Sequence, residues 1–306
     1  MAERANIYED IAKRCNGNIY IGVVGPVRTG KSTFIKKFME NFILPEIDND
    51  HDRSRALDEM PQSGGGKTVM TTEPKFVPTE SVTVHMKNGA RFGCRLVDCV
   101  GYLVSDAVGN YEDGNVRMVN TPWSKDPMPF EDAAKMGTQK VIRDHATVGI
   151  VITSDGTICD IARENYIEAE TAVIEEMKAQ NKPFVIVLNS AEPESERAKQ
   201  TAYSLEEKYA VPVALISCQN LETEDIEGIF EMLLCEFPTK EVVVSMPKYV
   251  SALGKDNGIY KSIADDIIKC AGTLSHLGDA QAVFSKLEEN ENVSGIYISD
   301  VDFGSG

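Results

Sequence analysis

The 306-residue sequence lacks any apolar run of the roughly 18 residues that a membrane-spanning helix requires. Runs such as Phe184–Leu188 are only long enough for a strand. The first six residues have charges but no apolar segment behind them, so no secretory signal is predicted. The seven cysteines show neither metal-ligand spacing nor a disulfide framework. We therefore expect reduced thiols and a cytoplasmic protein.

Positive charge is also scarce. The chain has 31 Lys and Arg against 48 Asp and Glu, a formal net charge of −17. Nucleic-acid binding needs clustered cations, so no nucleic acid is expected as the main partner. The same balance disfavours unaided binding to an anionic lipid surface, and contact with a membrane would need an adapter.

Short β-branched runs alternate with helical patterns over the first 240 residues, which predicts an α/β domain with a mainly parallel sheet flanked by helices. Strands are expected at 19–24, 148–152, 184–188 and 213–216, and a hairpin at 82–86 and 90–97 with Asn88-Gly89 as its turn. Helices are expected at 31–41, 162–177 and 221–234. Two stretches, 45–74 and 101–130, fit no element and are predicted to be functional loops.

The pattern changes after Pro238. Strand-like segments at 241–245 and 295–299 flank a helical region from about 259 to 287. We expect residues 1–240 to form one domain and residues 241–306 to begin a second, α+β domain that is incomplete at residue 306.

A phosphate-binding loop is predicted between the first strand and the helix that follows it. Residues 25–32 match the pattern of a glycine, any four residues, then Gly-Lys-Ser/Thr. Gly25 and Gly30 let the backbone amides curl around phosphate oxygens, Lys31 contributes a charge, and the Ser32 hydroxyl is a magnesium ligand. Arg28 either pairs with an acidic neighbour or reaches a phosphate. The predicted nucleotide-binding residues of this segment are Gly25, Arg28, Thr29, Gly30, Lys31, Ser32 and Thr33.

A second magnesium-site residue is predicted at the end of a strand. Asp98 is placed to hold a magnesium-bound water, and Gly101 to donate its backbone N–H to the γ-phosphate. Thr68, Thr71 and Thr72 precede this strand, and we favour Thr71 and Thr72 as residues that sense the γ-phosphate.

Three positions depart from the usual GTPase pattern. Tyr102 stands where many GTPases carry a glutamine that orients the attacking water, so slow intrinsic turnover is expected. In the base-reading segment Asn189 is present, but Ser190 and Glu192 replace a lysine and an aspartate. Weakened guanine selection is inferred, which leaves ATP as the favoured nucleotide.

Five sequence blocks together resemble the stage IV sporulation protein A family. They are GPVRTGKSTFIKKFME, PQSGGGKTVMTTEPKFVP, RLVDCVGY, RMVNTPWSKDPMPFEDAAKMGTQKVIRDH and IVITSDGTICDIARENYIEAE. The resemblance implies a GTPase-like (TRAFAC) P-loop fold that hydrolyses ATP with Mg²⁺. It implies Lys31 as the phosphate-loop lysine, Asp98 as the magnesium-site aspartate, and Thr71 and Thr72 as γ-phosphate sensors, with Thr71 a magnesium ligand.

The resemblance also implies where and with what the protein works. It implies polymerisation with itself into the basement layer of the endospore coat, on the forespore surface in the mother-cell cytoplasm. Implied partners are a small amphipathic membrane-anchoring peptide, stage V sporulation protein M, and other spore coat proteins. Two other readings stay open from the residues: a GTP-regulated switch without a polymer, and a scaffold that binds nucleotide without hydrolysing it.

Overall fold

The computed structural model describes residues 7–47, 49–61, 74–85, 91–104, 111–112 and 115–306. It divides into two compact units, Met1–Leu233 and Leu234–Gly306. The division lies a few residues before the predicted boundary at residue 240.

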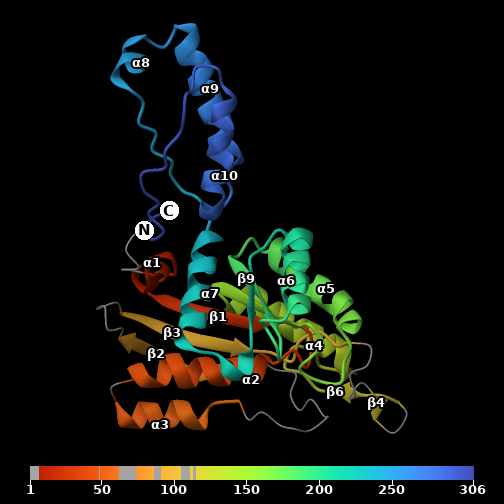
Figure 1. Ribbon diagram of the computed structural model, residues 1–306. Coiled ribbons are helices and arrows are strands. Elements are labelled where there is room, and N and C mark those ends of the chain that lie inside the picture. Colours follow the sequence, from red (N-terminus) through yellow and green to blue (C-terminus); the bar gives the residue numbers. More distant parts are fainter. Residues whose placement is uncertain (1–6, 48, 62–73, 86–90, 105–110, 113–114) are drawn as a thin grey trace. The chain divides into compact units, whose positions relative to one another are not determined.

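The first unit is built on a six-stranded sheet of order β10-β9-β8-β1-β3-β2 (Figure 1). Its strands are β1 (Asn18–Val24), β2 (Lys75–His85), β3 (Arg91–Asp98), β8 (Val148–Ser154), β9 (Phe184–Asn189) and β10 (Val213–Ile216). All neighbouring pairs are parallel except β2 and β3. Every residue of β8 and β9 is buried, as expected for central strands covered on both faces. The predicted mainly parallel sheet is thereby confirmed.

Helices cover both faces of this sheet. On one face α1 (Ile7–Arg14), α2 (Lys31–Phe38) and α7 (Thr223–Cys235) meet in an aromatic cluster, in which the Phe42 and Phe230 rings lie 5.5 Å apart. The other face carries α4 (Phe130–Lys140), α5 (Ile167–Ala179) and α6 (Glu196–Tyr209), which pack on the strands through a continuous apolar core. None of the helices among the described residues is long and apolar enough to cross a membrane.

Shorter elements complete the unit. They are η1 (Met39–Ile43), η2 (Leu44–Glu46), α3 (Asp50–Asp58), η3 (Val141–His145), η4 (Arg163–Tyr166), η5 (Cys218–Asn220), β4 (Tyr111–Glu112), β5 (Asn115–Val116), β6 (Met118–Val119) and β7 (Met128–Pro129).

Four expectations for this unit need correction. The stretch 101–130, expected to fit no element, contains the short strands β4 to β7. The stretch 45–74 contains a helix, α3, because Asn49 caps it by accepting from the His51 N–H and acidic residues follow in its first turn. Strand β2 begins at Lys75, earlier than predicted, and pairs with β3 across a register shift between Val77 and Val82. Helix α5 begins at Ile167, because residues Arg163–Tyr166 form a 3₁₀ turn. The predicted turn at Asn88-Gly89 lies outside the described residues.

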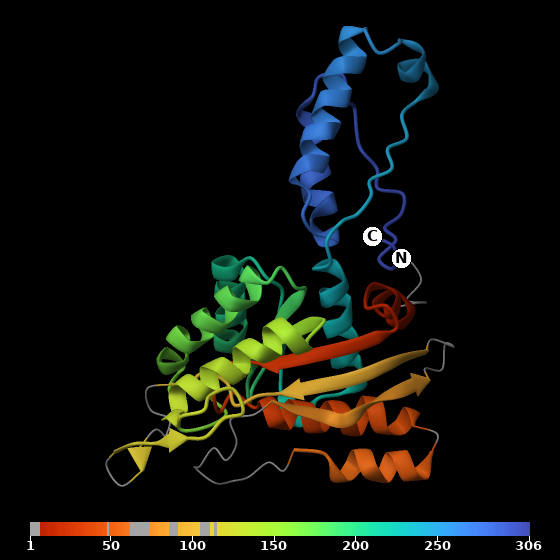
Figure 2. The same ribbon diagram turned by 180° about the vertical axis from the view of Figure 1, so that it is seen from behind.

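The second unit contains α8 (Lys248–Ala252), α9 (Gly258–Thr273) and α10 (Ala280–Phe284), drawn in blue in Figures 1 and 2. Two 3₁₀ turns, η6 (Leu277–Asp279) and η7 (Ser285–Glu289), flank α10. The strands expected at 241–245 and 295–299 are wrong. Neither segment has a hydrogen-bonded partner strand, which a β-branched run needs in order to form one, and Val243 stays 86% exposed. The described part of this unit is therefore helical rather than α+β.

Candidate functional site

The predicted phosphate loop connects β1 to α2. Gly25 and Gly30 have φ angles of 138° and 94°, a region that favours glycine. A Cβ atom at Gly25 would collide with the Ile152 carbonyl oxygen, and one at Gly30 with the Asn189 side chain. Both glycines are therefore required by the close approach of neighbouring strand ends.

Lys31 opens α2 with its side chain turned back over this loop. Its ammonium donates to the carbonyl oxygens of Pro26 at 2.6 Å and Gly25 at 3.2 Å. Burial lowers the pKa of Lys31, opposed by the negative charge of Asp98. The Thr29 hydroxyl also donates to the Pro26 carbonyl, at 2.9 Å. The ammonium thus lies inside the curl of the loop, on main-chain acceptors that a phosphate oxygen can replace.

Asp98 lies at the end of β3, opposite Val23 of β1, and its side chain faces the same loop. One of its carboxylate oxygens, Oδ2, is 3.5 Å from the Ser32 hydroxyl. Burial raises the pKa of Asp98 to about 6, and the nearby Lys31 charge limits that rise. A half-buried carboxylate beside a hydroxyl fits Mg²⁺, which takes one or two protein oxygens and completes its shell with phosphates and waters. The described residues contain no cluster of three or more acidic, His or Cys side chains that could hold a metal ion.

Gly101 and Tyr102 lie against the phosphate loop. Gly101 has a φ of 91°, and a Cβ atom there would collide with the Gly25 carbonyl and come within 2.6 Å of the Lys31 ammonium. The Val27 N–H donates to the Tyr102 carbonyl at 2.8 Å. The Tyr102 ring is buried and its hydroxyl is bonded to Gln139; burial raises its pKa to about 12. The phenol is thus engaged with α4.

Asn189, at the end of β9, is buried and forms hydrogen bonds to the main chain of two loops. Its amide donates to the Thr29 carbonyl at 3.0 Å, and its oxygen accepts from the Cys218 N–H at 2.9 Å. Ser190 is fully buried and its hydroxyl accepts from the Glu192 N–H at 3.0 Å. The Glu192 side chain is exposed to solvent.

The structure therefore brings together most of the predicted nucleotide-site residues. Those that meet around the loop are Gly25, Arg28, Thr29, Gly30, Lys31, Ser32, Asp98, Gly101 and Asn189. Thr33 follows in the first turn of α2 and is partly exposed. Thr68, Thr71 and Thr72 lie outside the described residues, and their roles stay predictions.

Sequence reasoning missed the residues that hold the loop from outside. Cys159 and Tyr166, from the segment after β8, both contact the Arg28 carbonyl, at 3.8 Å and 3.4 Å. Thr157 likewise accepts from the Ala191 N–H at 2.9 Å. These residues belong to no phosphate-loop motif. The helical spacing of apolar residues over 162–177 predicted only that Tyr166 faces the core.

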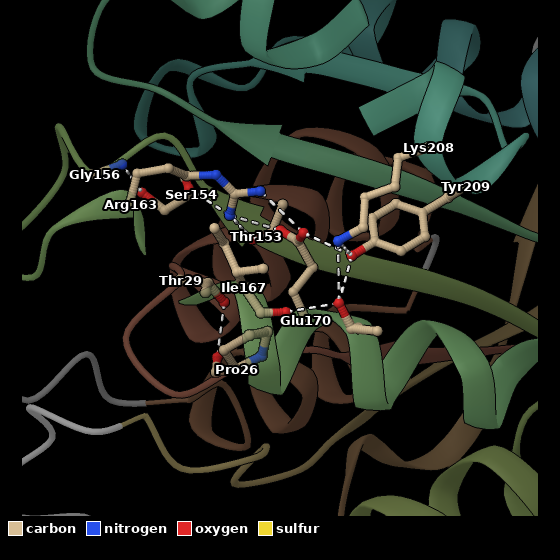
Figure 3. A network of polar contacts seen from close by, with 11 residues as sticks. Pro26, Thr29, Thr153, Ser154, Gly156, Arg163, Ile167, Glu170, Lys208 and Tyr209 are labelled. Atoms are coloured by element: carbon tan, nitrogen blue, oxygen red, sulfur yellow. Dashed lines mark hydrogen bonds and ion pairs between the residues drawn. The ribbon is translucent and has the colours of Figure 1, made fainter. Parts of the chain in front are cut away.

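Close to this segment, polar side chains from β8, α5 and α6 form a buried network (Figure 3). Arg163 forms a bidentate ion pair with Glu170, with distances of 2.6 Å and 2.9 Å. Glu170 is fully buried and also accepts from the hydroxyls of Thr153 at 2.6 Å and Tyr209 at 3.1 Å. Because Arg163 also donates to the Ser154 carbonyl at 3.3 Å, the network anchors the end of β8 to α5 and α6.

The chain is similar to known proteins over nearly its whole length. A family described as "Stage IV sporulation protein A, ATPase domain" matches residues 2–238. Proteins named "Stage IV sporulation protein A" match nearly the whole chain. The protein of Clostridioides difficile (strain 630) is 46% identical over 301 residues, that of Bacillus subtilis (strain 168) 46% over 304, and that of Bacillus anthracis 43% over 304.

These alignments cover 98–99% of the chain but 61–62% of each relative. The chain thus spans less than two thirds of the length of the relatives it matches. On identity and coverage together, the chain belongs to the stage IV sporulation protein A family and contains the ATPase domain of that family.

Proposed function

We propose that the chain is a magnesium-dependent ATPase of the GTPase-like P-loop type, which cleaves the bond between the β- and γ-phosphates. The observation that carries this is the convergence of the Lys31 ammonium, the Ser32 hydroxyl and the Asp98 carboxylate on one glycine loop at the carboxyl ends of β1 and β3. Ligands of open α/β sheets bind at this edge.

Each of these groups has a separate task. The Lys31 ammonium leaves the Pro26 carbonyl to contact phosphate oxygens, assisted by the amides at the start of α2. Ser32 and Asp98 are the residues that would hold Mg²⁺. The bound ion would supply positive charge that neutralises the charge developing on the phosphates. In the proposal Thr71 and Thr72 complete the site beside the γ-phosphate, and Thr71 is a further magnesium ligand.

ATP is the proposed nucleotide. The Asn189 side chain already donates to the Thr29 carbonyl and accepts from the Cys218 N–H. The backbone N–H of Glu192 donates to the Ser190 hydroxyl, while the Glu192 side chain is exposed to solvent. A guanine reader needs a carboxylate fixed against the base edge. The lack of such a fixed carboxylate among these contacts supports weak guanine selection.

The cellular role follows from the family. We propose that hydrolysis changes the conformation of the chain and drives its polymerisation into the basement layer of the spore coat, on the forespore surface in the mother-cell cytoplasm. The partners would be further copies of the protein, other coat proteins and a small amphipathic peptide, stage V sporulation protein M. That peptide would act as the membrane adapter, because a chain with a net charge of −17 is repelled by anionic lipid.

The test is a titration of ATP and GTP by calorimetry with Mg²⁺, read together with phosphate release. We expect ATP to bind more tightly than GTP, and Lys31→Ala and Asp98→Asn to hydrolyse at least about 100-fold more slowly. Lys36→Ala is the matched control, because Lys36 lies on the same helix in a half-exposed pair with Glu40. GTP preference would favour a GTP-regulated switch. ATP binding with no phosphate release would favour a scaffold.

A further inference from the structure

Arg28 has an unusual backbone conformation for its side chain. Its φ angle is 62°, in the left-handed region where a Cβ atom is disfavoured and glycine is not. It lies inside the phosphate loop, three residues before Lys31. A glycine here would adopt the same conformation without strain. A strained residue at a ligand site suggests that the side chain itself has a task.

Two side chains outside the loop hold this conformation. The hydroxyl of Tyr166, which is fully buried, donates to the Arg28 carbonyl at 3.4 Å, and the Cys159 thiol lies 3.8 Å from the same oxygen. The hydroxyl and thiol are 3.1 Å from each other. The Arg28 carbonyl is thus bound by two residues of the segment after β8. These contacts fix the orientation of the Arg28 backbone, and with it the direction in which the side chain projects.

The guanidinium of Arg28 has no binding partner among the described residues. The residue is exposed, and its side chain forms no hydrogen bond or ion pair with another described residue. Other arginines of this unit are engaged: Arg163 with Glu170 and Arg143 with Glu176. A free guanidinium on a phosphate loop is suited to phosphate oxygens, since its planar fork of donors matches them.

Among the described residues, no side chain stands in for the water-orienting glutamine of related NTPases. Tyr102 occupies the position of the water-orienting glutamine, but its hydroxyl is engaged with Gln139 of α4. Within the described residues, Lys31 is the other cation of the loop. Comparable NTPases add an arginine, from the same chain or from a partner, to stabilise the charge of the transition state.

We propose that Arg28, held by Tyr166 and Cys159, contributes that stabilising charge from within the chain's own phosphate loop. This inference rests on the ATPase function proposed above. In the reaction a water oxygen bonds to the γ-phosphorus while the bond from phosphorus to the β–γ bridging oxygen breaks. The electron pair stays on ADP, and the water proton leaves with the released phosphate. The guanidinium contacts the bridging oxygen, where negative charge accumulates.

The first experiment replaces Arg28 with glycine, which removes the guanidinium and relieves the backbone strain together. We expect Arg28→Gly to unfold at the same temperature as the wild type or higher, and to bind ATP within about threefold. Its kcat is expected to fall about 100-fold or more, since an arginine in this role is worth 10³–10⁵ elsewhere. Arg28→Lys keeps the charge without the fork, so we expect an intermediate kcat.

Chemical rescue separates a charge effect from a structural one. Guanidinium at about 20 mM lies far below the molar concentrations that denature proteins. We expect it to restore part of the kcat of Arg28→Gly and to leave the wild type and Lys31→Ala unchanged. Sodium at the same ionic strength is the control and should give no rescue.

Tyr166 is tested as a positioning residue with a double-mutant cycle. Tyr166→Phe keeps the ring and removes the hydroxyl that binds the Arg28 carbonyl. We expect it to lower kcat about tenfold in the wild type, while leaving kcat unchanged in the Arg28→Gly background. A merely structural role for the hydroxyl would give the same loss in both backgrounds.

Three results would overturn the inference. They are an Arg28→Gly kcat within threefold of the wild type, a Kd for ATP that rises as much as kcat/KM falls, or no rescue by guanidinium. In each case the wild type still hydrolyses ATP and Lys31→Ala does not, so the proposed ATPase function survives. If the wild type releases no phosphate at all, the proposed function fails and this inference fails with it.

Discussion

The side chain of Asn189 donates a hydrogen bond of 3.0 Å to the carbonyl of Thr29, so that the end of β9 is attached to the predicted phosphate loop. The same side chain accepts from the Cys218 N–H at 2.9 Å. One buried amide therefore joins three segments that are far apart in the sequence, and it does so with both of its polar atoms.

We expect Asn189→Ala to lower the free energy of unfolding by about 1–3 kcal/mol, because two buried main-chain groups lose their partner. Nucleotide affinity should fall as well, since the loop loses its support. Asn189→Asp is the informative comparison, because a carboxylate still accepts from Cys218 but cannot donate to Thr29. Denaturant unfolding and ATP calorimetry measure both effects. An unchanged midpoint and Kd for both variants would show that these hydrogen bonds are unimportant.

We expect Gly101→Ala to abolish ATP hydrolysis. The new methyl group would collide with the Gly25 carbonyl and crowd the Lys31 ammonium, on a backbone with φ of 91°. Gly228→Ala in α7 is the control, because its Cβ atom would meet open space and should stabilise the helix by about 0.5–1 kcal/mol. Phosphate-release rates and thermal unfolding of both variants test this. A fully active Gly101→Ala would mean that this glycine does not approach the loop closely.

The ion pair of Arg163 and Glu170 should be costly to break on one side. We expect Arg163→Met to destabilise the first unit by about 3–5 kcal/mol, because it leaves a fully buried carboxylate without its cation. The double variant Arg163→Met/Glu170→Met should recover much of that loss. Lys199→Met is the exposed control: its partner Glu194 is 93% exposed, and less than about 1 kcal/mol is expected. Equal losses in the single and double variants would contradict this account.

Cysteine reactivity should depend on pH in a residue-specific way. Burial raises the pKa of Cys94 to about 12 and that of Cys99 to about 11. The thiolate is the reactive form, so at pH 8 only about one Cys99 thiol in a thousand is ionised. We expect iodoacetamide to label the half-buried Cys159, Cys235 and Cys270 before the buried Cys94 and Cys99, and labelling of Cys99 to accelerate as the pH rises. Peptide mapping by mass spectrometry gives the rates. Equal labelling of Cys94 and Cys270 at pH 8 in folded protein would refute the prediction.

The elements that sequence reasoning predicted well are those whose signal is local. The run Phe184–Leu188 predicts a buried strand because parallel strands are covered on both faces, and the structure buries every residue of β9. Prediction from the sequence was wrong where an element needs a second, distant segment to pair with. The β-branched residues Val242–Val244 read as a strand, but a strand exists only when another pairs with it, and none does so in the described part of the second unit. Helix α3 was missed because the Asn and Asp residues that cap and begin it are also the residues typical of loops.

The sequence alone determined the glycine-containing loop at residues 25–32, because the spacing of Gly25, Gly30, Lys31 and Ser32 within eight residues fixes their order along one loop. Only the tertiary structure decided what surrounds that loop. Asn189 reaches Thr29 across 160 positions, and Tyr166 reaches Arg28 across 138. Such contacts depend on the order of the strands in the sheet, which places β8 beside β1 and β9 next after β8. Local patterns do not encode that order, because it is set by the packing of the whole unit.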